Sequence, residues 1–174
     1  MRSRHIAGLL IAVSMLAPPL AAQSRPVELG VDMGALVDFG NGETSTFFDV
    51  PTGVLRVGFW MNDKISIEPN LWLSVAHVGG ETNTRFSVAP ALLYHFKTDR
   101  TMMRPYLAVF PGIYHQSGGA GSQFFAGGGL GALFPLQEQL AFRAEALFSH
   151  YFESDNFSDL NELGLRLGFS FFTN

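Results

Sequence analysis

The sequence contains no cysteine, so a disulfide framework and a thiolate metal site are both excluded. After residue 22 it also lacks any uninterrupted apolar run of about 18 residues, the length that a transmembrane helix requires. Charged residues make up only 15% of the chain, and its 174 residues, with no long linker, allow one domain. Glycine and phenylalanine are abundant, with 19 and 17 residues, which suits strands with bulky side chains on one face and small ones on the other.

The first 22 residues have the organisation of a secretory signal peptide. Arg2 and Arg4 form a positive start, residues 6–16 are apolar but too short to span a membrane as a helix, and residues 18–22 offer small side chains for cleavage. We predict a signal peptide at 1–22 and one mature domain at 23–174. That domain carries nine basic and fifteen acidic residues, a net charge of −6 that argues against nucleic acid as a partner.

Two segments near the end of the chain alternate between apolar and polar positions. In 140–152, every second residue from Leu140 to Phe152 is apolar except His150. The residues between them include Arg143 and Glu145. In 161–172, one set is leucine and phenylalanine, and the other is polar or glycine. Side chains alternate across a β-strand, so each segment has one apolar face. Both have about 12 residues, and a tilted membrane-spanning strand needs about 9–11, whereas ordinary strands average about 5–6. The length favours a bilayer.

The same alternation begins at residue 26 and defines six earlier segments. We predict strands at 26–39, 46–60, 65–78, 84–96, 104–116 and 123–136. Polar or glycine-rich loops are expected at 40–45, 79–83 and 117–122, and shorter or more basic turns at the other end. Bulges are expected at the prolines within the strands, Pro69, Pro90, Pro105 and Pro111. Together the segments predict an all-β fold, an eight-stranded antiparallel up-and-down transmembrane β-barrel with both termini on one side.

The inward faces of such a barrel collect five acids and five arginines. They are Glu28, Asp32, Glu68, Glu145 and Glu162, with Arg56, Arg85, Arg104, Arg143 and Arg166. An isolated ion in a low dielectric costs several kcal/mol, so these groups must pair. An eight-stranded barrel is just wide enough to be filled by its own side chains. We predict a salt-bridge network that plugs the lumen, with Glu145 shared between Arg143 and Arg166.

The last strand carries a further pattern: a polar residue, a glycine, an apolar residue and an aromatic residue at Glu162, Gly164, Leu167 and Phe169. With the signal peptide and eight amphipathic strands, it resembles the small bacterial outer-membrane barrels of the OmpX and OmpA type over residues 26–172. The resemblance implies the outer membrane of a Gram-negative cell, contact with its lipids including lipopolysaccharide, insertion by the barrel assembly machinery, and a monomer. The expected role is structural or adhesive, through the outer loops, without catalysis, cofactor or metal.

Three alternatives stay open. The barrel could be a narrow ion or small-solute channel, or a soluble lipocalin-like binder with its apolar face inside. A lipid A deacylase-like barrel is the enzymatic alternative, since His150 and Glu162 match two members of its triad. The serine expected two residues after the histidine is Phe152, however, and Ser149 lies on the opposite face, out of reach of its base.

Glycine, histidine and aromatic residues suggest structural roles. The glycine-rich run at 127–131 lacks the lysine and the helix of a phosphate-binding loop, and fits a role in relieving crowding. His77, His115 and His150 are expected near one rim, pointing outwards from alternate strands, so they cannot converge on a metal. Aromatic side chains are expected in a belt at the membrane–water interface: Phe39, Phe86, Tyr114 and Phe125.

Overall fold

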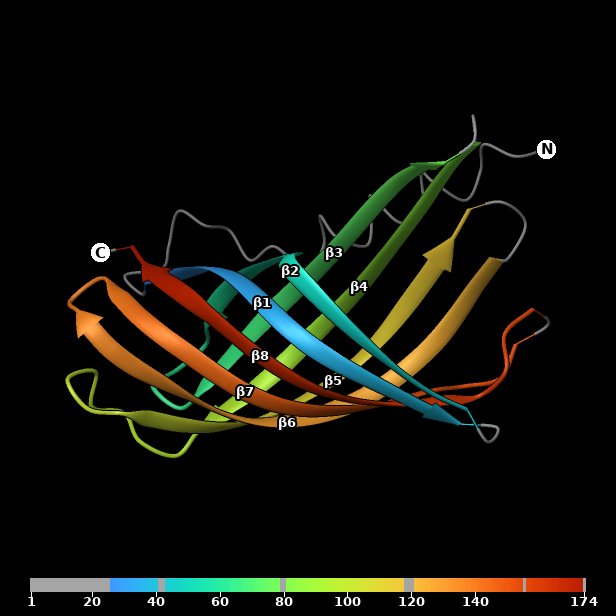
Figure 1. Cartoon of the computed structure of the whole chain (residues 1–174). Helices are drawn as coiled ribbons and strands as arrows, with labels where there is room; N and C mark the ends of the chain where they lie inside the picture. Colours follow the sequence, from blue (N-terminus) through green and yellow to red (C-terminus); the bar gives the residue numbers. More distant parts are fainter. Residues whose placement is uncertain (1–25, 41–42, 79–80, 118–120, 155, 174) are drawn as a thin grey trace, which may run out of the picture.

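The computed structural model describes residues 26–40, 43–78, 81–117, 121–154 and 156–173, and the predicted signal peptide lies outside this part. The described residues form eight strands (Figure 1). These are β1 (Val27–Gly40), β2 (Glu43–Trp60), β3 (Ile65–Val78), β4 (Glu81–His95), β5 (Arg104–Gln116), β6 (Gly121–Gln137), β7 (Leu140–Tyr151) and β8 (Leu160–Phe172). Each strand pairs antiparallel with the next, and β8 pairs with β1, so the sheet closes. The predicted eight-stranded antiparallel barrel is confirmed.

No helix in the described part of the chain is long and apolar enough to cross a membrane.

The two ends of the barrel differ in what they contain. The start of β1, the end of β8 and the connections 61–64, 96–103 and 138–139 lie at one end, which we call the terminal end; the opposite end is the distal end (Figure 1). In the turn 61–64, Asn62 Oδ1 accepts hydrogen bonds from the amides of Lys64 and Ile65 at 2.8 and 2.9 Å. In the connection 96–103, the Thr101 hydroxyl and amide both donate to Asp99, which holds the pKa of that carboxyl below its usual value.

The observed bounds of β3 and β5 are the predicted ones. The connections at the distal end are shorter than predicted. β2, β4 and β6 begin earlier than predicted, so most of the expected loops 40–45 and 79–83, and the last two residues of 117–122, belong to strands. Two residues separate β1 from β2, and two separate β3 from β4. The prediction of long distal loops there is therefore wrong. These residues are polar because the hairpins run on beyond the length that a bilayer requires, and a paired strand in water needs no apolar face.

The outer face of the barrel is apolar and exposed, as predicted. On β8, Leu163, Leu165 and Leu167 point outwards, and Leu165 is 62% exposed, while Glu162 and Ser170 on the alternate face are buried. Exposing a leucine to water rather than burying it costs about 1.5–3 kcal/mol. The same pattern recurs on β1, β3, β5 and β6. The apolar face therefore suits hydrocarbon, and the polar face lines the lumen.

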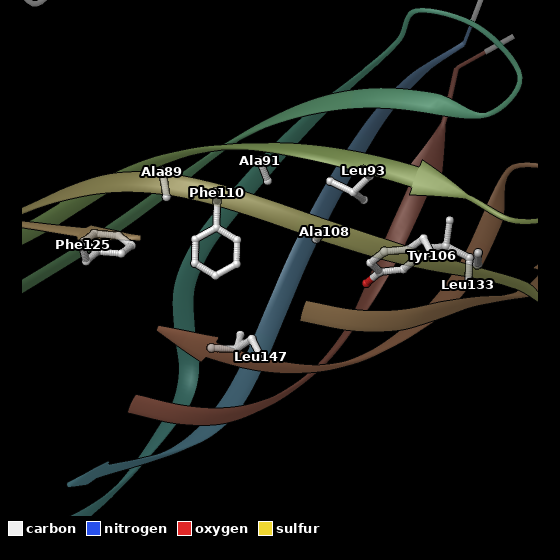
Figure 2. Packing of buried hydrophobic residues seen from close by; sticks show 10 residues of the cluster. Ala89, Ala91, Leu93, Tyr106, Ala108, Phe110, Phe125, Leu133 and Leu147 are labelled. Carbon is white, nitrogen blue, oxygen red and sulfur yellow. The ribbon is translucent and has the colours of Figure 1, made fainter. Parts of the chain in front are cut away.

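Part of the interior is an apolar cluster that the predicted aromatic belt did not anticipate. Figure 2 shows Tyr106, Phe110 and Phe125 directed into the barrel with Leu133 and Leu147. Phe125 is buried and stacks on Tyr151, with ring centroids 4.8 Å apart. The belt assignment is thus wrong for Phe125, and likewise for Tyr114, which lines an interior cavity described below. Large apolar side chains occupy both faces of β5 and β6. The alternation of apolar and polar residues therefore did not show which side chains of these two strands point into the barrel.

Glycines make the space that these inward rings occupy. A Cβ atom at Gly127 would meet the Phe110 ring, and one at Gly131 would meet the Tyr106 ring. Both glycines lie on the inward face of β6, opposite Phe110 and Tyr106 in the β5 register. The run at 127–131 therefore has the crowding-relief role that its sequence context favoured.

The four prolines do not cause bulges, contrary to prediction. Pro69 pairs with Pro90 in a continuous β3–β4 register, and β5–β6 runs unbroken through Pro105 and Pro111. A proline lacks its amide hydrogen towards one neighbour only, so the ladder on the other side persists. Near Pro90 the β4–β5 partners skip from Val88 to Leu92 without a change of register. Register shifts occur instead between Asp32 and Gly34 and between Pro135 and Gln137.

We expect Leu165→Arg to lower the free energy of unfolding in lipid vesicles by about 2–4 kcal/mol, because it places a charge near the middle of the outer face. Leu136→Arg is the matched control: Leu136 is also exposed but lies beside the connection 138–139, where the cost falls to about 0–1 kcal/mol. Reversible urea unfolding measures both. Equal, small losses for the two variants would contradict the assignment of the outer face to lipid.

Candidate functional site

Two arginines and four carboxylates meet in the middle of the lumen. We call this set the charge layer: Glu28, Asp32, Arg56, Glu68, Arg143 and Glu145. They come from β1, β2, β3 and β7, and all six are buried. The inward face of each strand supplies them because polar residues occupy alternate positions there. The layer therefore sits where an isolated ion would be unstable and only paired ions are tolerated.

Arg56 holds the β1 side of the charge layer. Its guanidinium forms a two-pronged contact with Asp32, through Nε to Oδ2 and through Nη2 to Oδ1, the latter at 2.9 Å. Nη1 also lies 3.3 Å from Glu28, and Nη2 donates to the Ser170 hydroxyl at 3.3 Å. A Cβ atom at Gly30 would collide with this guanidinium, so the glycine leaves room for it. The planar fork of arginine suits such bidentate pairing.

Arg143 crosses the lumen. Its Nη1 donates to Glu68 Oε2 at 2.7 Å, and its Nη2 lies 3.5 Å from Glu145. Arg143 is on β7 and Glu68 on β3, strands four apart in a closed ring of eight and hence on opposite walls. Glu68 also contacts Arg56 at 3.5 Å. Glu68 is therefore shared between two arginines, and so is Glu28, which lies 3.3 Å from Arg56 and 3.8 Å from Arg143.

The predicted sharing of Glu145 between Arg143 and Arg166 is wrong. Glu145 and Arg166 are direct cross-strand partners, yet the ion pair that Glu145 makes is with Arg143. The Glu145 carboxylate leans over Gly129 of β6, where an added Cβ atom would approach it to 3.1 Å. Arg166 instead lines a cavity on the distal side. The missing side chain at Gly129 thus sets the direction of Glu145.

Four of the ten predicted residues lie outside the charge layer. Glu162 accepts a 3.4 Å hydrogen bond from the Tyr151 hydroxyl, and Arg85 is exposed near the distal rim. Arg104 is buried with its guanidinium over the rings of Trp60 and Phe172, at 5.1 and 5.4 Å from their centroids. Among the residues that the structure describes, no ion pair joins Arg85, Arg104 or Arg166 to a carboxylate. The sequence pattern indicated the inward face but not the height along the barrel.

An aromatic layer, which the sequence analysis missed, closes the terminal end below the charge layer. It consists of Trp60, His95, Tyr106 and Phe172, with Arg104. Trp60 stacks on His95 at 4.3 Å, and His95 Nε2 lies 3.1 Å from the Ser66 hydroxyl. Arg143 sits over the Tyr106 ring at 4.6 Å and so joins the two layers. Trp60 and His95 each end a strand at an inward position, and this placement in the sequence could have predicted the aromatic layer.

The distal half of the lumen contains two adjoining cavities of about 130 and 330 Å³. Both are lined by Leu36, Trp72, Tyr114, Tyr151 and Glu162. Val54, Ser87 and Arg166 border the deeper cavity, and Asp38, Arg85 and Phe157 border the outer one. The interior is therefore filled at the terminal end and hollow at the distal end.

The structure separates the residues that suggested a deacylase. His150 lies beside Asn161, with Nδ1 and Oδ1 3.0 Å apart, and its ring packs edge-on against Phe152. Ser149 and Glu162 are paired across β7 and β8 on the inward face instead. His115 lies near Phe86 and Ser122, while the side chain of His77 lies outside the described ones. Within the described ranges, no group of three or more His, Cys, Asp or Glu side chains could hold a metal ion.

Comparison with known proteins adds a family and a set of similar folds. Residues 7–171 match the family model described as the outer membrane protein beta-barrel domain. No curated protein matches the chain by sequence. The crystal structure of Neisserial surface protein A is 12% identical, with a TM-score of 0.64 over 83% of this chain and 96% of that one.

Two further crystal structures share the fold. The outer membrane protein OprG from Pseudomonas aeruginosa is 10% identical, with a TM-score of 0.53 over 86% of this chain and 97% of that one. Ail, the attachment invasion locus protein of Yersinia pestis, is 11% identical, with a TM-score of 0.51 over 87% of this chain and 100% of that one. At these identities the likeness concerns the fold alone.

We expect Glu68→Ala to lower the free energy of unfolding by about 3–5 kcal/mol, because it removes the carboxylate nearest to the buried Arg143 guanidinium, at 2.7 Å, and leaves Arg143 only its longer contacts with Glu28 and Glu145. A variant with Glu68→Leu, Arg143→Met and Glu145→Leu should lose less than the single change, since it removes Arg143 together with its two nearest carboxylates and leaves Arg56 paired with Asp32 and Glu28. Glu138→Ala, in the exposed connection 138–139, serves as the control and should change stability by under about 0.5 kcal/mol. Urea unfolding in lipid vesicles compares the three. Additive losses in the combined variant would mean that the charges are separately solvated.

Proposed function

Since the chain belongs to the outer membrane protein beta-barrel domain family, we propose that it is a non-conducting, non-enzymatic barrel with a structural or adhesive role. It is an outer-membrane protein, and its apolar outer face is the surface that such a location requires. The proposal concerns what the barrel does there. It depends on the state of the lumen and on the surface at the distal end.

The observation that carries the non-conducting proposal is the 2.7 Å contact between Arg143 and Glu68. These side chains join opposite walls at the level of the charge layer, and Tyr106 packs directly against Arg143. Below them, Trp60, His95 and Arg104 stack across the terminal end. An ion entering from the distal cavities would have to displace both layers. Separating a buried ion pair is unfavourable by several kcal/mol, which supports a closed lumen.

The distal end is the surface available for adhesion. Its strands extend past the length that a bilayer needs, and the eight residues between β7 and β8 form its longest connection. Ser154 and Phe157 bridge within that segment, and Gln123 donates to the carbonyls of Phe152 and Ser158 at 3.1 and 2.9 Å. A fixed rim suits contact with another surface. The similar fold of Ail, an attachment protein by its description, favours this role by analogy.

The partners we propose follow from the same surfaces. The outer face would contact outer-membrane lipids, including lipopolysaccharide near the distal end. The pattern of Glu162, Gly164, Leu167 and Phe169 on β8 would be read by the barrel assembly machinery. A monomer is expected, because β8 pairs with β1 and the closed sheet offers no free edge along that seam. Absence of catalysis is supported by the separation of His150 from Ser149 and Glu162 across the wall.

Purified protein in planar bilayers should show no open-channel steps, because the charge and aromatic layers block the lumen. A variant with Arg143→Ala and Tyr106→Ala removes the two groups that join the layers and should produce measurable steps, which shows that the assay detects an opened barrel. Steps of reproducible size in the wild type would overturn the proposal and favour a narrow channel.

A further inference from the structure

Two charged side chains that line the distal cavities make no ion pair within the described part of the chain. Arg166 of β8 borders the deeper cavity, and Asp38 of β1 borders the outer one. The Oδ1 atom of Asp38 is also buried without a hydrogen-bond partner. A charged or polar atom of this kind is unfavourable unless something pairs with it. Each of the two groups is therefore a candidate contact for a ligand.

Glu162 adds a second carboxylate beside Asp38. The two residues are opposite each other in the register of β1 and β8, and both line the outer cavity. Like charges directly opposite each other destabilise a sheet, and a cationic group placed between them relieves the repulsion. Because Asp38 Oδ1 lacks a donor, a cation that carries N–H groups fits this wall best.

Arg166 lies deeper in the lumen than the two carboxylates. It is opposite Gly34 in the same register, four residues from the pair of Asp38 and Glu162, which is about 13–14 Å along an antiparallel strand. Arg166 passes over Gly34, where an added Cβ atom would lie 3.4 Å from its Cγ atom. The side chains of Glu162 and Arg166 both border the deeper cavity of about 130 Å³, so their charged ends are closer together than their Cα atoms.

Aromatic side chains form much of the remaining wall. Trp72, Tyr114 and Tyr151 border both cavities, and Phe157 borders the outer one. The centroid of the Tyr114 ring lies 6.4 Å from that of Trp72, 6.5 Å from that of Tyr151 and 6.0 Å from that of Phe157. Such rings offer apolar contact and attract a cation placed over their faces. The wall therefore suits a ligand with an apolar side chain and an ammonium group.

Arg85 marks the mouth of the outer cavity. It borders that cavity from β4 and is exposed to solvent, so the cavity reaches solvent at the distal end. Like Arg166, it makes no ion pair within the described residues. Water and salt screen an exposed charge more than a partly buried one, and Arg166 is partly buried. Arg166 is therefore the stronger partner for an anionic group.

A ligand that meets both ends of this site must carry its two charges several ångströms apart. A free amino acid spans about 3.5 Å, whereas an extended dipeptide spans up to about 7 Å and a tripeptide up to about 10 Å. The two adjoining cavities, of about 130 and 330 Å³, suit a ligand of that size. Charge separation and volume thus both favour a short peptide over a single amino acid.

We propose that the distal cavities bind a free peptide of two or three residues, whose ammonium group meets Asp38 and Glu162 and whose carboxylate meets Arg166. The peptide enters from the distal end, and its side chains pack against the rings. This inference does not require the adhesive role. It is compatible with a closed lumen, because the site lies on the distal side of the charge layer.

Trp72 reports on the site, since the only other tryptophan, Trp60, is buried in the aromatic layer. The protein in phosphatidylcholine vesicles is titrated with the dipeptide alanyl-phenylalanine, which contains no tryptophan. We expect a saturable change in emission that Trp72→Phe lacks. The N-acetyl dipeptide has no ammonium group and the dipeptide amide has no carboxylate. Each should bind about tenfold more weakly, because each loses a charge-assisted hydrogen bond. Free phenylalanine should also bind more weakly, since its two charges cannot reach both ends of the site.

Three variants assign the charges. Arg166→Gln should weaken binding of the dipeptide about tenfold and leave binding of its amide unchanged, because the amide has no carboxylate to lose a partner. Asp38→Asn should weaken binding of the dipeptide and leave binding of the N-acetyl form unchanged. Arg85→Gln is the matched control and should change binding by under about twofold at physiological salt, where an exposed charge is screened.

Equal binding of the dipeptide and either blocked form would overturn the proposal, because one of the two charges would then not be recognised. The absence of a saturable change at millimolar dipeptide, or a change that persists in Trp72→Phe, would exclude the cavity as the site. These comparisons use only the wild type and Trp72→Phe, so they decide the question even if a charge variant does not fold. A larger loss in Arg85→Gln than in Arg166→Gln would contradict the assignment of the carboxylate to Arg166.

Discussion

The ladder between β1 and β8 is the interaction on which the rest of this structure depends. It runs from the pair of Glu28 and Phe172 to the pair of Phe39 and Asn161 and turns an open sheet into a closed wall. In hydrocarbon an unpaired backbone group is unfavourable by several kcal/mol, so a sheet can span a bilayer only when it has no free edge. Closure also creates an interior, and it is this interior that receives every polar face.

Filling the interior then becomes the main structural problem. Four carboxylates and two arginines meet at one level, and rings stack across the terminal end. A buried ion pair contributes little net stability, because desolvation offsets most of the attraction. What the contact between Arg143 and Glu68 provides is a fixed connection between opposite walls. Glycines make this packing possible. Gly30 leaves room for the Arg56 guanidinium, and Gly131 leaves room for the Tyr106 ring.

The two halves of the lumen consequently differ in how they are filled. The terminal half is packed, and the proposed closed lumen depends on this packing. The distal half is hollow, and its lining carries both arginines and carboxylates.

The sequence by itself determined the strands, their two faces and the closed antiparallel fold, because alternation with a period of two is a local property of each segment. It also placed all ten charged residues on inward faces of particular strands. Only the tertiary structure decided which of them meet. Glu68 and Glu28, rather than Glu145, are shared between arginines, since the pairing depends on the width of the closed barrel, on the stagger of β3 against β7 and on the space over Gly129. The inward rings of β5 and β6 likewise depend on register between strands, a relation between distant residues that no single segment encodes.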